Sequence, residues 1–410
     1  MATAKAQKDF TELVVEPFSD PDPKPLVGLL PARALADADS KFVTVTVRGE
    51  AVVVHYKESS PPPESQSQSR SPSPRDIDAV VCLHGANGSE FSFRNLLPRL
   101  ASDAGVRAIA FDRPPYGLSS RPKLKKNGDA ATDAATDAAG ATATATATAA
   151  AHFVYTPEGQ AELTLALMDA LGVTRACVLG HSAGAPVALD AALRAPERIP
   201  TLALVAPAIF VGGDPLAGVP LDRALRFAWF RFLISQDGPG LNLVRGSVRR
   251  QLAAIEEGRT YANLSEDVRR AYARPTKAEG WDEGLLQSFR AGSFADASER
   301  LRREVPNALA PAKTKVVVVV GKNDRTTPPA LSEALRDVLI ECGVEDVRYE
   351  LMPTASHLPM EEEAGGVRET FEALVVDVVL GGGGDGGGDH DHGKGGGGGG
   401  GDPGSIASTA

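Results

Sequence analysis

Short apolar segments alternate along the chain with longer segments that have the length of helices. Ala79–Leu83 and Lys315–Val320 are nearly continuous apolar runs, as expected for strands buried on both faces of a sheet. Pro157–Leu171 is a predicted helix, with Thr156 as its N-cap and a proline at its first position. The predicted strands are Phe42–Val47, Ala51–Tyr56, Ala79–Leu83, Arg107–Phe111, Ala176–Leu179, Leu202–Val205, Lys315–Val320 and Val347–Leu351. This alternation predicts an α/β fold with a mostly parallel central sheet flanked by helices.

The alternation stops between about Pro207 and Pro311, where strand-like runs are missing. Helices are expected there around Leu221–Ile234, Val244–Glu257, Ser265–Ala273 and Glu283–Ala291. We interpret this stretch, about residues 208–311, as a helical cap inserted into the α/β domain. Its first helix interleaves aromatic residues with arginines, which is typical of a helix that roofs an apolar acyl pocket; contact with a membrane surface is the alternative.

Composition indicates that much of the 410-residue chain lies outside this domain. Ser and Pro fill 12 of the 17 positions from 59 to 75, and 16 of the 42 glycines fall within the last thirty residues. The expected division is a flexible segment 1–34, one domain over 35–380 with low-complexity inserts 58–75 and 121–152, and a disordered tail 381–410. The second insert follows a strand's carboxyl end, so we expect it near the mouth of the pocket.

Charge and cysteine content narrow the class of protein. A formal net charge of −10 argues against a general nucleic-acid-binding protein. No run approaches the roughly 18 consecutive apolar residues of a membrane span, and early acidic residues argue against a secretory signal. Cys82, Cys177 and Cys342 fit buried thiols in a reducing compartment, so a cytoplasmic location is favoured, with a plastid as the alternative. The sequence does not indicate an oligomeric state.

A G-x-S-x-G motif, Gly180–Gly184, joins the predicted strand Ala176–Leu179 to the helix Ala183–Arg194. Such a strand-to-helix turn is sharp, and only small neighbours avoid collision with its backbone. The turn presents Ser182 at the carboxyl edge of the sheet, with a helix N-terminus behind it that stabilises negative charge. Ser182 is therefore the candidate nucleophile; a glycine-rich turn without catalytic function is the alternative.

A nucleophilic serine needs a general base, and the base needs an acid that orients it. Of the seven histidines, His357 follows the last predicted strand and is therefore expected at the same sheet edge as Ser182. Asp324 lies four residues beyond the strand Lys315–Val320 and is expected to accept the Nδ1 proton of His357. The alternatives are a surface-loop histidine for His357 and an Asx turn for Asp324.

The tetrahedral oxyanion of an acyl transfer needs two preorganised N–H donors. One is expected from the backbone of Ala183, which follows the nucleophile. The other is expected from Ala86, in the loop after the strand Ala79–Leu83, where neighbouring glycines allow close backbone approach. Both donors are backbone groups and are therefore insensitive to side-chain identity. The acyl transfer expected from these residues needs no cofactor or metal ion.

With these residues the chain resembles the α/β-hydrolase superfamily, in its capped single-domain branch, and in detail its plant and algal members. The resemblance includes the order Ser182, Asp324, His357. It is carried by the segments His84–Gly88, Phe111–Ser119, Gly180–Gly184, Ala195–Arg198 and Val205–Ala208. It implies an α/β-hydrolase fold with a cap and a serine hydrolase activity, without implying a substrate. In this family Asp112 and Arg113 are expected to shape a loop beside the site rather than to react. His181 adjoins the nucleophile on the far side of the elbow turn, so it is expected to be structural rather than the base.

Ser182 also distinguishes between branches of the family. Epoxide hydrolases and haloalkane dehalogenases carry aspartate at this position, so serine favours acyl chemistry on esters, thioesters or activated lactones, as in a carboxylesterase acting on a small apolar acyl substrate. Carbon–carbon bond hydrolases and perhydrolases share the serine and remain alternatives. A ligand receptor with a slow triad is an alternative of another class.

Overall fold

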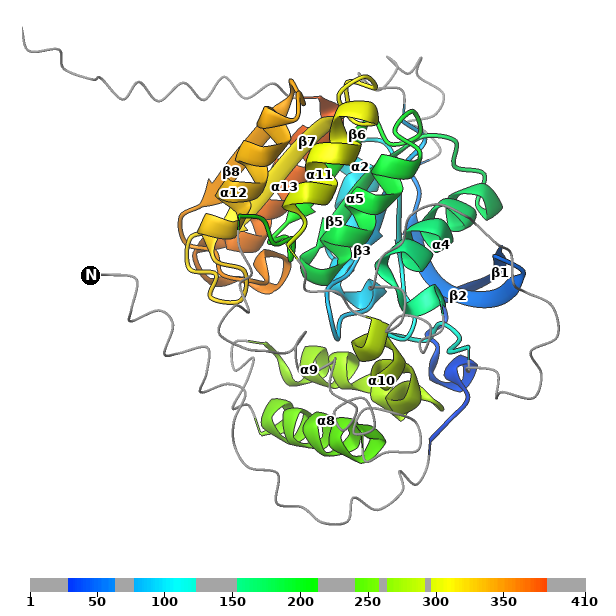
Figure 1. Cartoon of the computed structure of the whole chain (residues 1–410). Helices are drawn as coiled ribbons and strands as arrows, with labels where there is room; N and C mark the ends of the chain where they lie inside the picture. The colour runs from blue at the N-terminus through cyan, green and yellow to red at the C-terminus, as the bar shows by residue number, and fades with distance from the viewer. Residues whose placement is uncertain are drawn as a thin grey trace, which may run out of the picture.

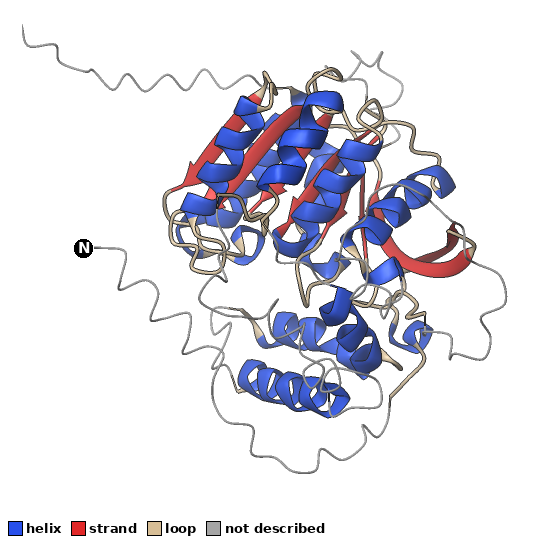
Figure 2. Cartoon of the chain, viewed as in Figure 1, coloured by secondary structure: helices blue, strands red, loops and turns tan. Residues whose placement is uncertain are grey.

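The computed structural model describes residues 29–62, 77–122, 153–212, 240–257, 264–291 and 296–381. Its described part contains one eight-stranded sheet of order β1-β2-β4-β3-β5-β6-β7-β8 (Figure 2). The strands are β1 Lys41–Val47, β2 Glu50–Ser59, β3 Ala79–Leu83, β4 Arg107–Phe111, β5 Ala176–His181, β6 Thr201–Val205, β7 Lys315–Gly321 and β8 Val347–Met352. Each contains or nearly matches a predicted apolar run. The predicted fold class, a mostly parallel α/β sheet, is confirmed.

Strand direction decides where the site can form. β1 pairs with β2, and β2 with β4, in antiparallel register. From β4 to β8 all neighbours pair in parallel, with Leu83 opposite Gly180 and His181 opposite Val205. The carboxyl ends of these parallel strands therefore meet at one edge, where the loops that follow β3, β5, β7 and β8 lie together.

Helices cover both faces of the sheet (Figure 1). α4 Pro157–Ala170, α5 Ala185–Arg194 and α12 Pro329–Glu341 share a core with one set of strand residues, which includes Val316 and Val318. α2 Leu96–Asp103 and α13 Val367–Leu380 share the opposite core with the alternate set, which includes Val317 and Val319. The period of two along β7 thus explains why this strand is apolar throughout: each face has its own core.

The cap lies beyond the carboxyl edge of the sheet, below it as drawn in Figure 1. Its described helices are α8 Gly240–Glu256, α9 Glu266–Ala273, the 3-10 helix η6 Arg274–Lys277 and α10 Trp281–Ala291. The predicted aromatic helix Leu221–Ile234 falls outside the described residues. α11 Ser298–Glu304 was not predicted, and its Leu301 packs in the sheet core with α5 and α12. α11 thus packs with the sheet core although it lies within the range 208–311 assigned to the cap, and the boundary of the cap stays a prediction.

The chain before β1 is joined to the cap. Leu30 forms a parallel bridge with Ala278, and the Leu30 amide donates to the Lys277 carbonyl at 2.9 Å. The 3-10 helix η1 Ala32–Leu35 follows. The folded part of the chain thus begins before residue 35, earlier than expected, whereas residues 1–28 lie outside the described ranges. Other short 3-10 helices are η3 Glu90–Phe93, η4 Phe153–Tyr155, η5 Ser182–Gly184, η7 Val305–Asn307, η8 Pro359–Glu361 and η9 Ala364–Gly366.

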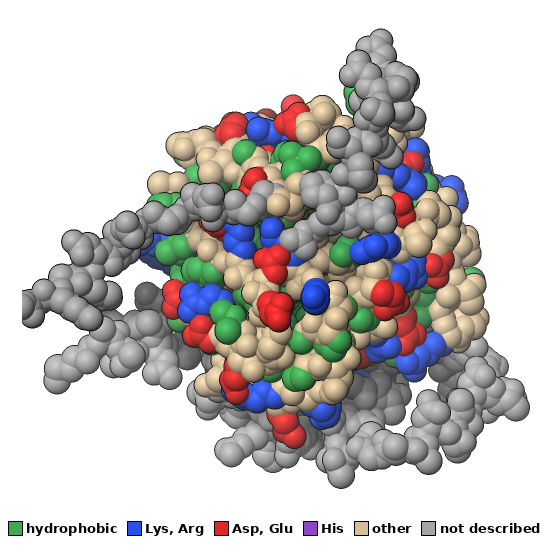
Figure 3. Space-filling view, turned by 90° about the horizontal axis from the view of Figure 1, so that it is seen from above, with side chains coloured by type: hydrophobic (Ala, Val, Ile, Leu, Met, Phe, Trp, Pro, Cys, Tyr) green, Lys and Arg blue, Asp and Glu red, His purple; other side chains and the backbone are tan. Residues whose placement is uncertain are grey.

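The surface remote from the cap carries both signs of charge. In the view of Figure 3, basic and acidic side chains of the described residues are interspersed with apolar and neutral ones rather than gathered in a patch of one sign. No helix in the described ranges is both long enough and apolar enough to cross a bilayer. Most of the inserts 58–75 and 121–152, and nearly all of the tail 381–410, fall outside the described residues.

Candidate active site

The turn between β5 and α5 holds Ser182 in a left-handed backbone conformation. Its φ is +50°, a region that residues other than glycine seldom adopt. Small neighbours make the turn feasible. A Cβ at Gly180 would lie 2.6 Å from the Gly184 carbonyl oxygen, and a Cβ at Gly184 would lie 2.7 Å from that of His84. Packing between the turn, the start of α5 and the loop after β3 therefore requires the spacing of the G-x-S-x-G motif.

The structure brings together the three residues expected to form a triad. His357 Nε2 lies 3.1 Å from Ser182 Oγ, and His357 Nδ1 lies 2.8 Å from Asp324 Oδ2. Ser182 follows β5, Asp324 follows β7 and His357 follows β8, so three adjacent loops at one sheet edge supply them. The common sheet edge thus brings together side chains that are up to 175 positions apart in the sequence.

Hydrogen bonds surround the Asp324 carboxylate. Oδ1 accepts the amides of Thr326 at 2.8 Å and Thr327 at 2.9 Å, and Oδ2 lies 2.8 Å from the Thr327 hydroxyl. Burial acts to raise the pKa of Asp324, but the hydrogen bonds from His357 and Thr327 outweigh it and hold the pKa below its usual value. The Asx turn considered as an alternative is present too, and it holds the same carboxylate that His357 contacts.

His181 supports the loop that carries His357. Its Nε2 donates to the His357 carbonyl oxygen at 2.9 Å. Burial lowers the pKa of His181 to about 3, and the neighbouring His357 acts in the same direction. The ring is therefore neutral and committed to a backbone contact, in agreement with the structural role expected for it.

The loop after β3 packs directly against Ser182. A Cβ at Gly85 would lie 3.0 Å from the Ser182 Cβ, so only glycine allows this approach. The next residue, Ala86, lines the pocket, and within the described residues its amide has no hydrogen-bond acceptor. The Ala183 amide lies in the first turn of η5, where helix N–H groups lack intrahelical partners. Both expected oxyanion donors are thus adjacent to Ser182.

A buried arginine holds that loop in place. The Arg113 guanidinium donates to the His84 carbonyl oxygen from Nε at 2.9 Å and from Nη2 at 2.6 Å, while the Arg113 amide donates to His84 Nε2 at 3.0 Å. Burial lowers the pKa of His84 to about 3, and the charge of Arg113 acts in the same direction. The His84 ring is therefore neutral, and its contacts with Arg113 hold the loop after β3 in place.

Asp112 organises the neighbouring loop. Its Oδ2 lies 2.7 Å from His55 Nδ1 and accepts the Leu118 amide at 2.6 Å, while Oδ1 accepts the Glu90 amide at 2.7 Å. All of these contacts are buried, and none reaches Ser182. Asp112 and Arg113 therefore shape the loops beside the site, as the resemblance implied.

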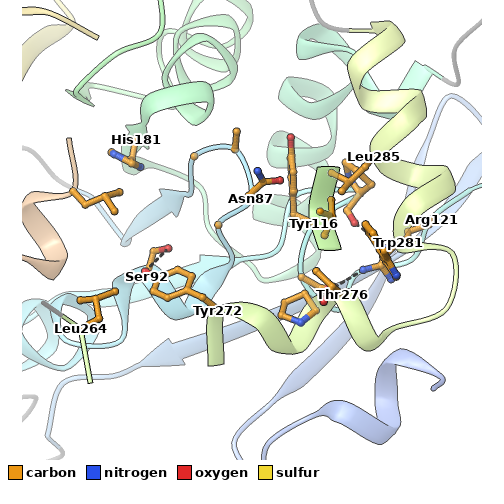
Figure 4. Close-up of a pocket in the computed structure, with 18 residues that line it drawn as sticks. Asn87, Ser92, Tyr116, Arg121, His181, Leu264, Tyr272, Thr276, Trp281 and Leu285 are labelled. Carbon is orange, nitrogen blue, oxygen red and sulfur yellow. Dashed lines mark hydrogen bonds between the residues drawn. The ribbon is translucent and has the colours of Figure 1, made fainter. Parts of the chain in front are cut away.

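A pocket opens beside Ser182 between the sheet edge and the cap (Figure 4). Most of its accessible wall is apolar, and polar side chains lie at several places along it. The lining residues are Gly85, Ala86, Asn87, Gly88, Ser92, Pro115, Tyr116, Gly117, Arg121, His181, Val248, Leu264, Tyr272, Pro275, Thr276, Trp281, Leu285 and Leu358. Within the described ranges, His, Cys, Asp and Glu side chains form no group of three able to hold a metal ion.

A model of the α/β-hydrolase fold matches residues 78–364, from β3 to the start of α13. The chain belongs to the α/β-hydrolase family. The uncharacterized hydrolase YugF of Bacillus subtilis (strain 168) is 29% identical to it over 291 residues, 69% of this chain and 84% of YugF. A 2-hydroxy-6-oxo-6-phenylhexa-2,4-dienoate hydrolase of Comamonas testosteroni is 26% identical over 73% of this chain and 87% of its own length.

Solved structures share the fold of this α/β-hydrolase at low sequence identity. A hydrolase from Pseudomonas aeruginosa PA01 matches with a TM-score of 0.52 and 19% identity, over 84% of this chain and 99% of that one. A thermophilic esterase from Thermogutta terrifontis matches with a TM-score of 0.51 and 17% identity, over 82% and 99%. These relatives are bacterial, so they lend no support to the expected kinship with plant and algal members.

Several residues of the hydrolase site were not found from the sequence. Arg94 forms a bidentate pair with Glu361, at 2.6 and 2.7 Å, and the hydroxyl of Tyr272 from cap helix α9 bonds to the same carboxylate. That hydroxyl also contacts Ser92 Oγ at 3.2 Å, on the pocket wall (Figure 4). These residues are up to 267 positions apart and carry no local motif. The link joins the cap to the segment just after His357.

Proposed function

We propose that this α/β-hydrolase is a serine hydrolase that cleaves carboxylic esters or related acyl compounds through an acyl-enzyme. The observation that supports it is the continuous hydrogen-bonded chain from Ser182 Oγ through His357 to Asp324, at 3.1 and 2.8 Å. A nucleophile, its base and the acid that orients the base form this geometry on many unrelated folds. The left-handed φ of Ser182 adds support, because it is the conformation of a nucleophile elbow.

In the first step, Ser182 Oγ attacks the substrate carbonyl carbon while its proton moves to His357 Nε2. Asp324 accepts the Nδ1 hydrogen of His357 and stabilises the imidazolium that forms. The amides of Ala86 and Ala183 bind the oxyanion, and the N-terminus of α5 adds a favourable field. His357 then gives its proton to the leaving group as the bond to the carbonyl carbon breaks.

In the second step, His357 takes a proton from water, and the resulting oxygen nucleophile attacks the acyl carbon. Collapse of this intermediate releases the acid and returns the proton to Ser182. Each bond and proton is accounted for by substrate, water and the triad, so the proposed reaction uses no cofactor or metal. Apolar lining residues such as Val248, Leu264 and Leu285 favour a substrate with a small apolar acyl part.

Carbon–carbon bond hydrolysis is the second candidate. The Comamonas testosteroni relative, 26% identical over most of both chains, carries the name of a dienoate hydrolase. Epoxide hydrolases also match, but over 29% of this chain. Serine at position 182 disfavours their alkyl-ester chemistry. A panel that pairs aryl esters with 2-hydroxy-6-oxo-dienoates separates the two acyl reactions by the ratio of kcat/KM.

The test is the variant Ser182→Ala against Ser102→Ala, a substitution at an exposed serine of α2. We expect Ser182→Ala to abolish 4-nitrophenyl ester hydrolysis and labelling by a fluorophosphonate, with the thermal unfolding midpoint retained. Ser102→Ala should keep both reactions. Turnover with a burst phase in Ser182→Ala would overturn the proposal, and so would ligand-induced stabilisation without product release in the unaltered protein.

A further inference from the structure

The end of the pocket remote from Ser182 carries a guanidinium without a carboxylate partner among the described residues. Figure 4 shows His181 at one end of the pocket and Arg121 at the other. Arg121 Nε donates to the Pro115 carbonyl at 2.9 Å, Nη2 to the Gly117 carbonyl at 2.5 Å, and Nη1 to the Glu279 carbonyl at a long 3.4 Å. Within the described part of the chain, neutral carbonyls take three of its five hydrogens, so donors remain there and no described carboxylate pairs with the charge.

Two other arginines near the pocket are paired with carboxylates, whereas the buried Arg113, like Arg121, donates to neutral oxygen atoms. Arg94 forms its bidentate pair with Glu361, and Arg274 pairs with Asp37. Hydrogen bonds with these carboxylates raise the pKa of both groups against the effect of burial. For Arg121, burial prevails and lowers the pKa. The acids that act on it from farther away are already engaged, Asp282 with Arg245 and Asp112 with His55.

A second unused donor lies beside Arg121. The indole Nε1 of Trp281 is buried and has no hydrogen-bond partner among the described residues, and the Trp281 side chain, only 3% exposed, lines the pocket. The Arg121 stem runs along this part of α10: a Cβ at Gly284 would lie 3.3 Å from Arg121 Cδ. Figure 4 shows Arg121 and Trp281 at the same end of the pocket. A buried donor without a partner is unfavourable, so it marks a place where a bound group supplies the acceptor.

We propose that Arg121 and Trp281 form a carboxylate-binding subsite, and that the substrate is an acyl compound with a carboxylate at the end remote from the scissile carbonyl. A planar carboxylate accepts two hydrogen bonds from a guanidinium and one from an indole with good geometry. The apolar wall between the two ends, which includes Leu285 and Val248, receives the chain that joins the carboxylate to the carbonyl. This inference rests on the proposed function, since it assigns the reacting end to Ser182.

The experiment compares matched esters with one leaving group. Mono-4-nitrophenyl esters of the C4 to C8 dicarboxylic acids are paired with their methyl-capped diesters. At the best chain length we expect kcat/KM for the free acid to exceed that for the capped ester by about tenfold or more. Salt at 0.5 M should reduce this preference, since the interaction is ionic.

Variants assign the preference to named groups. Arg121→Gln should bring the ratio of the paired kcat/KM values to within about twofold, and Trp281→Phe should lower it by a smaller factor. Arg270→Gln is the matched control: it removes an exposed cap arginine of α9 that pairs with Glu266 and is not among the pocket lining, so the ratio should stay as in the unaltered protein. The thermal unfolding midpoint of each variant shows whether it is folded. The ratio of kcat/KM for the paired esters in the unaltered protein tests the subsite without any substitution.

Equal kcat/KM for the paired esters at every length would overturn the subsite, as would an Arg121→Gln variant that lowers both members of a pair alike. Binding distinguishes this failure from failure of the proposed function. In the Ser182→Ala background, glutarate or suberate should raise the unfolding midpoint, and adding Arg121→Gln should remove that shift. A shift without ester turnover in the unaltered protein overturns the proposed function and keeps the subsite; no shift overturns the subsite.

Discussion

Thr327 is the residue that does most to hold the Asp324 carboxylate in place. Its amide and hydroxyl contact different oxygens of that carboxylate, at 2.9 and 2.8 Å, and the hydroxyl also lies 3.0 Å from the Ala206 carbonyl oxygen. The loop after β7 is thereby joined to the loop after β6. The distance of Asp324 from the preceding strand identified it in the sequence, but nothing in the sequence identified Thr327 as the residue that contacts both of its carboxylate oxygens.

Thr327→Val removes the hydroxyl and keeps the shape of the side chain. We expect kcat on a 4-nitrophenyl ester to fall about fivefold to tenfold with little change in KM, because the carboxylate that orients His357 loses one hydrogen bond. Thr326→Val is the control, since Thr326 contacts Asp324 through its amide alone and its side chain is exposed. Equal loss in both variants would contradict the assignment.

Glu90 is a buried acid that the proposed mechanism does not use. Its side chain is 2% exposed, and burial together with the nearby charge of Asp112 raises its pKa to about 7, although Lys57, His55 and Arg274 oppose the shift. A folded-state pKa above the unfolded value means that the native state binds the additional proton. The contribution of Glu90 to the free energy of unfolding is therefore most favourable at low pH, and it falls as the pH rises from about 5 through 7.

Glu90→Gln mimics the protonated acid at every pH. We expect it to match the unaltered protein near pH 5 and to be more stable by on the order of 1–3 kcal/mol at pH 8, from urea unfolding at both values. Comparing the two proteins isolates Glu90 from Asp190, whose pKa burial raises to about 6. Glu299→Gln, at an exposed position of α11, should show no such change with pH. If the free energy of unfolding of Glu90→Gln changed with pH in the same way as that of the unaltered protein, the assignment would be contradicted.

At the scale of elements, the turn from β5 to α5 tolerates the least change. A methyl group at Gly180 would meet the Gly184 carbonyl oxygen at 2.6 Å and the Ala185 Cα at 2.7 Å, both of them backbone atoms that have little freedom to move. The strand, the turn and the helix are packed as one unit around Ser182.

Gly180→Ala should lower the free energy of unfolding by at least about 2–3 kcal/mol and abolish ester turnover, because the turn opens to admit the methyl group. Gly246→Ala provides the contrast in α8, where a Cβ meets no atom of the described residues within 4 Å. That change should stabilise the protein by about 0.5–1 kcal/mol, since alanine favours the helix. Both values come from urea unfolding, and a Gly180→Ala variant with the stability of the unaltered protein would refute the packing argument.

Elements with a strong local pattern were predicted well. β7 was found because it is buried on both faces and therefore apolar at every position, and α4 because a threonine cap and a proline begin it. α11 was missed because its sequence, SERLRRE, has one apolar residue, Leu301, and polar residues at the other positions. Its place on the sheet comes from the packing of that leucine between α5 and α12, which no local period reveals.

At the scale of the whole molecule, the three cysteines report on the integrity of the core. Cys82 and Cys177 lie on adjacent strands, fully buried under α2 and α13, and burial raises the pKa of Cys82 well above its usual value. Cys342 is 7% exposed at the end of α12. None of the three forms a disulfide in the described part of the chain.

We expect an aromatic disulfide reagent to modify none of the three thiols rapidly in the native protein and all three in denaturant. With time Cys342 should react first, by local opening of the end of α12, and Cys82 and Cys177 should react together at the rate set by global unfolding. Peptide mapping of the modified sites identifies the order. Rapid native modification of Cys82 would mean that the sheet core opens far more readily than its packing suggests.

Local physical chemistry made much of this hydrolase readable from its residues. Short apolar runs that alternate with helix-length segments favour the inside of a parallel sheet, and a serine between small residues after such a run favours a sharp strand-to-helix turn. Parallel strands then carry Ser182, Asp324 and His357 to a common edge. Contacts between distant segments followed no such rule. Tertiary structure alone decided three features: the link from Arg94 to Glu361 and Tyr272, the packing of α11 on the sheet, and the place of Arg121 in the pocket. Each depends on packing between elements rather than on neighbours in sequence.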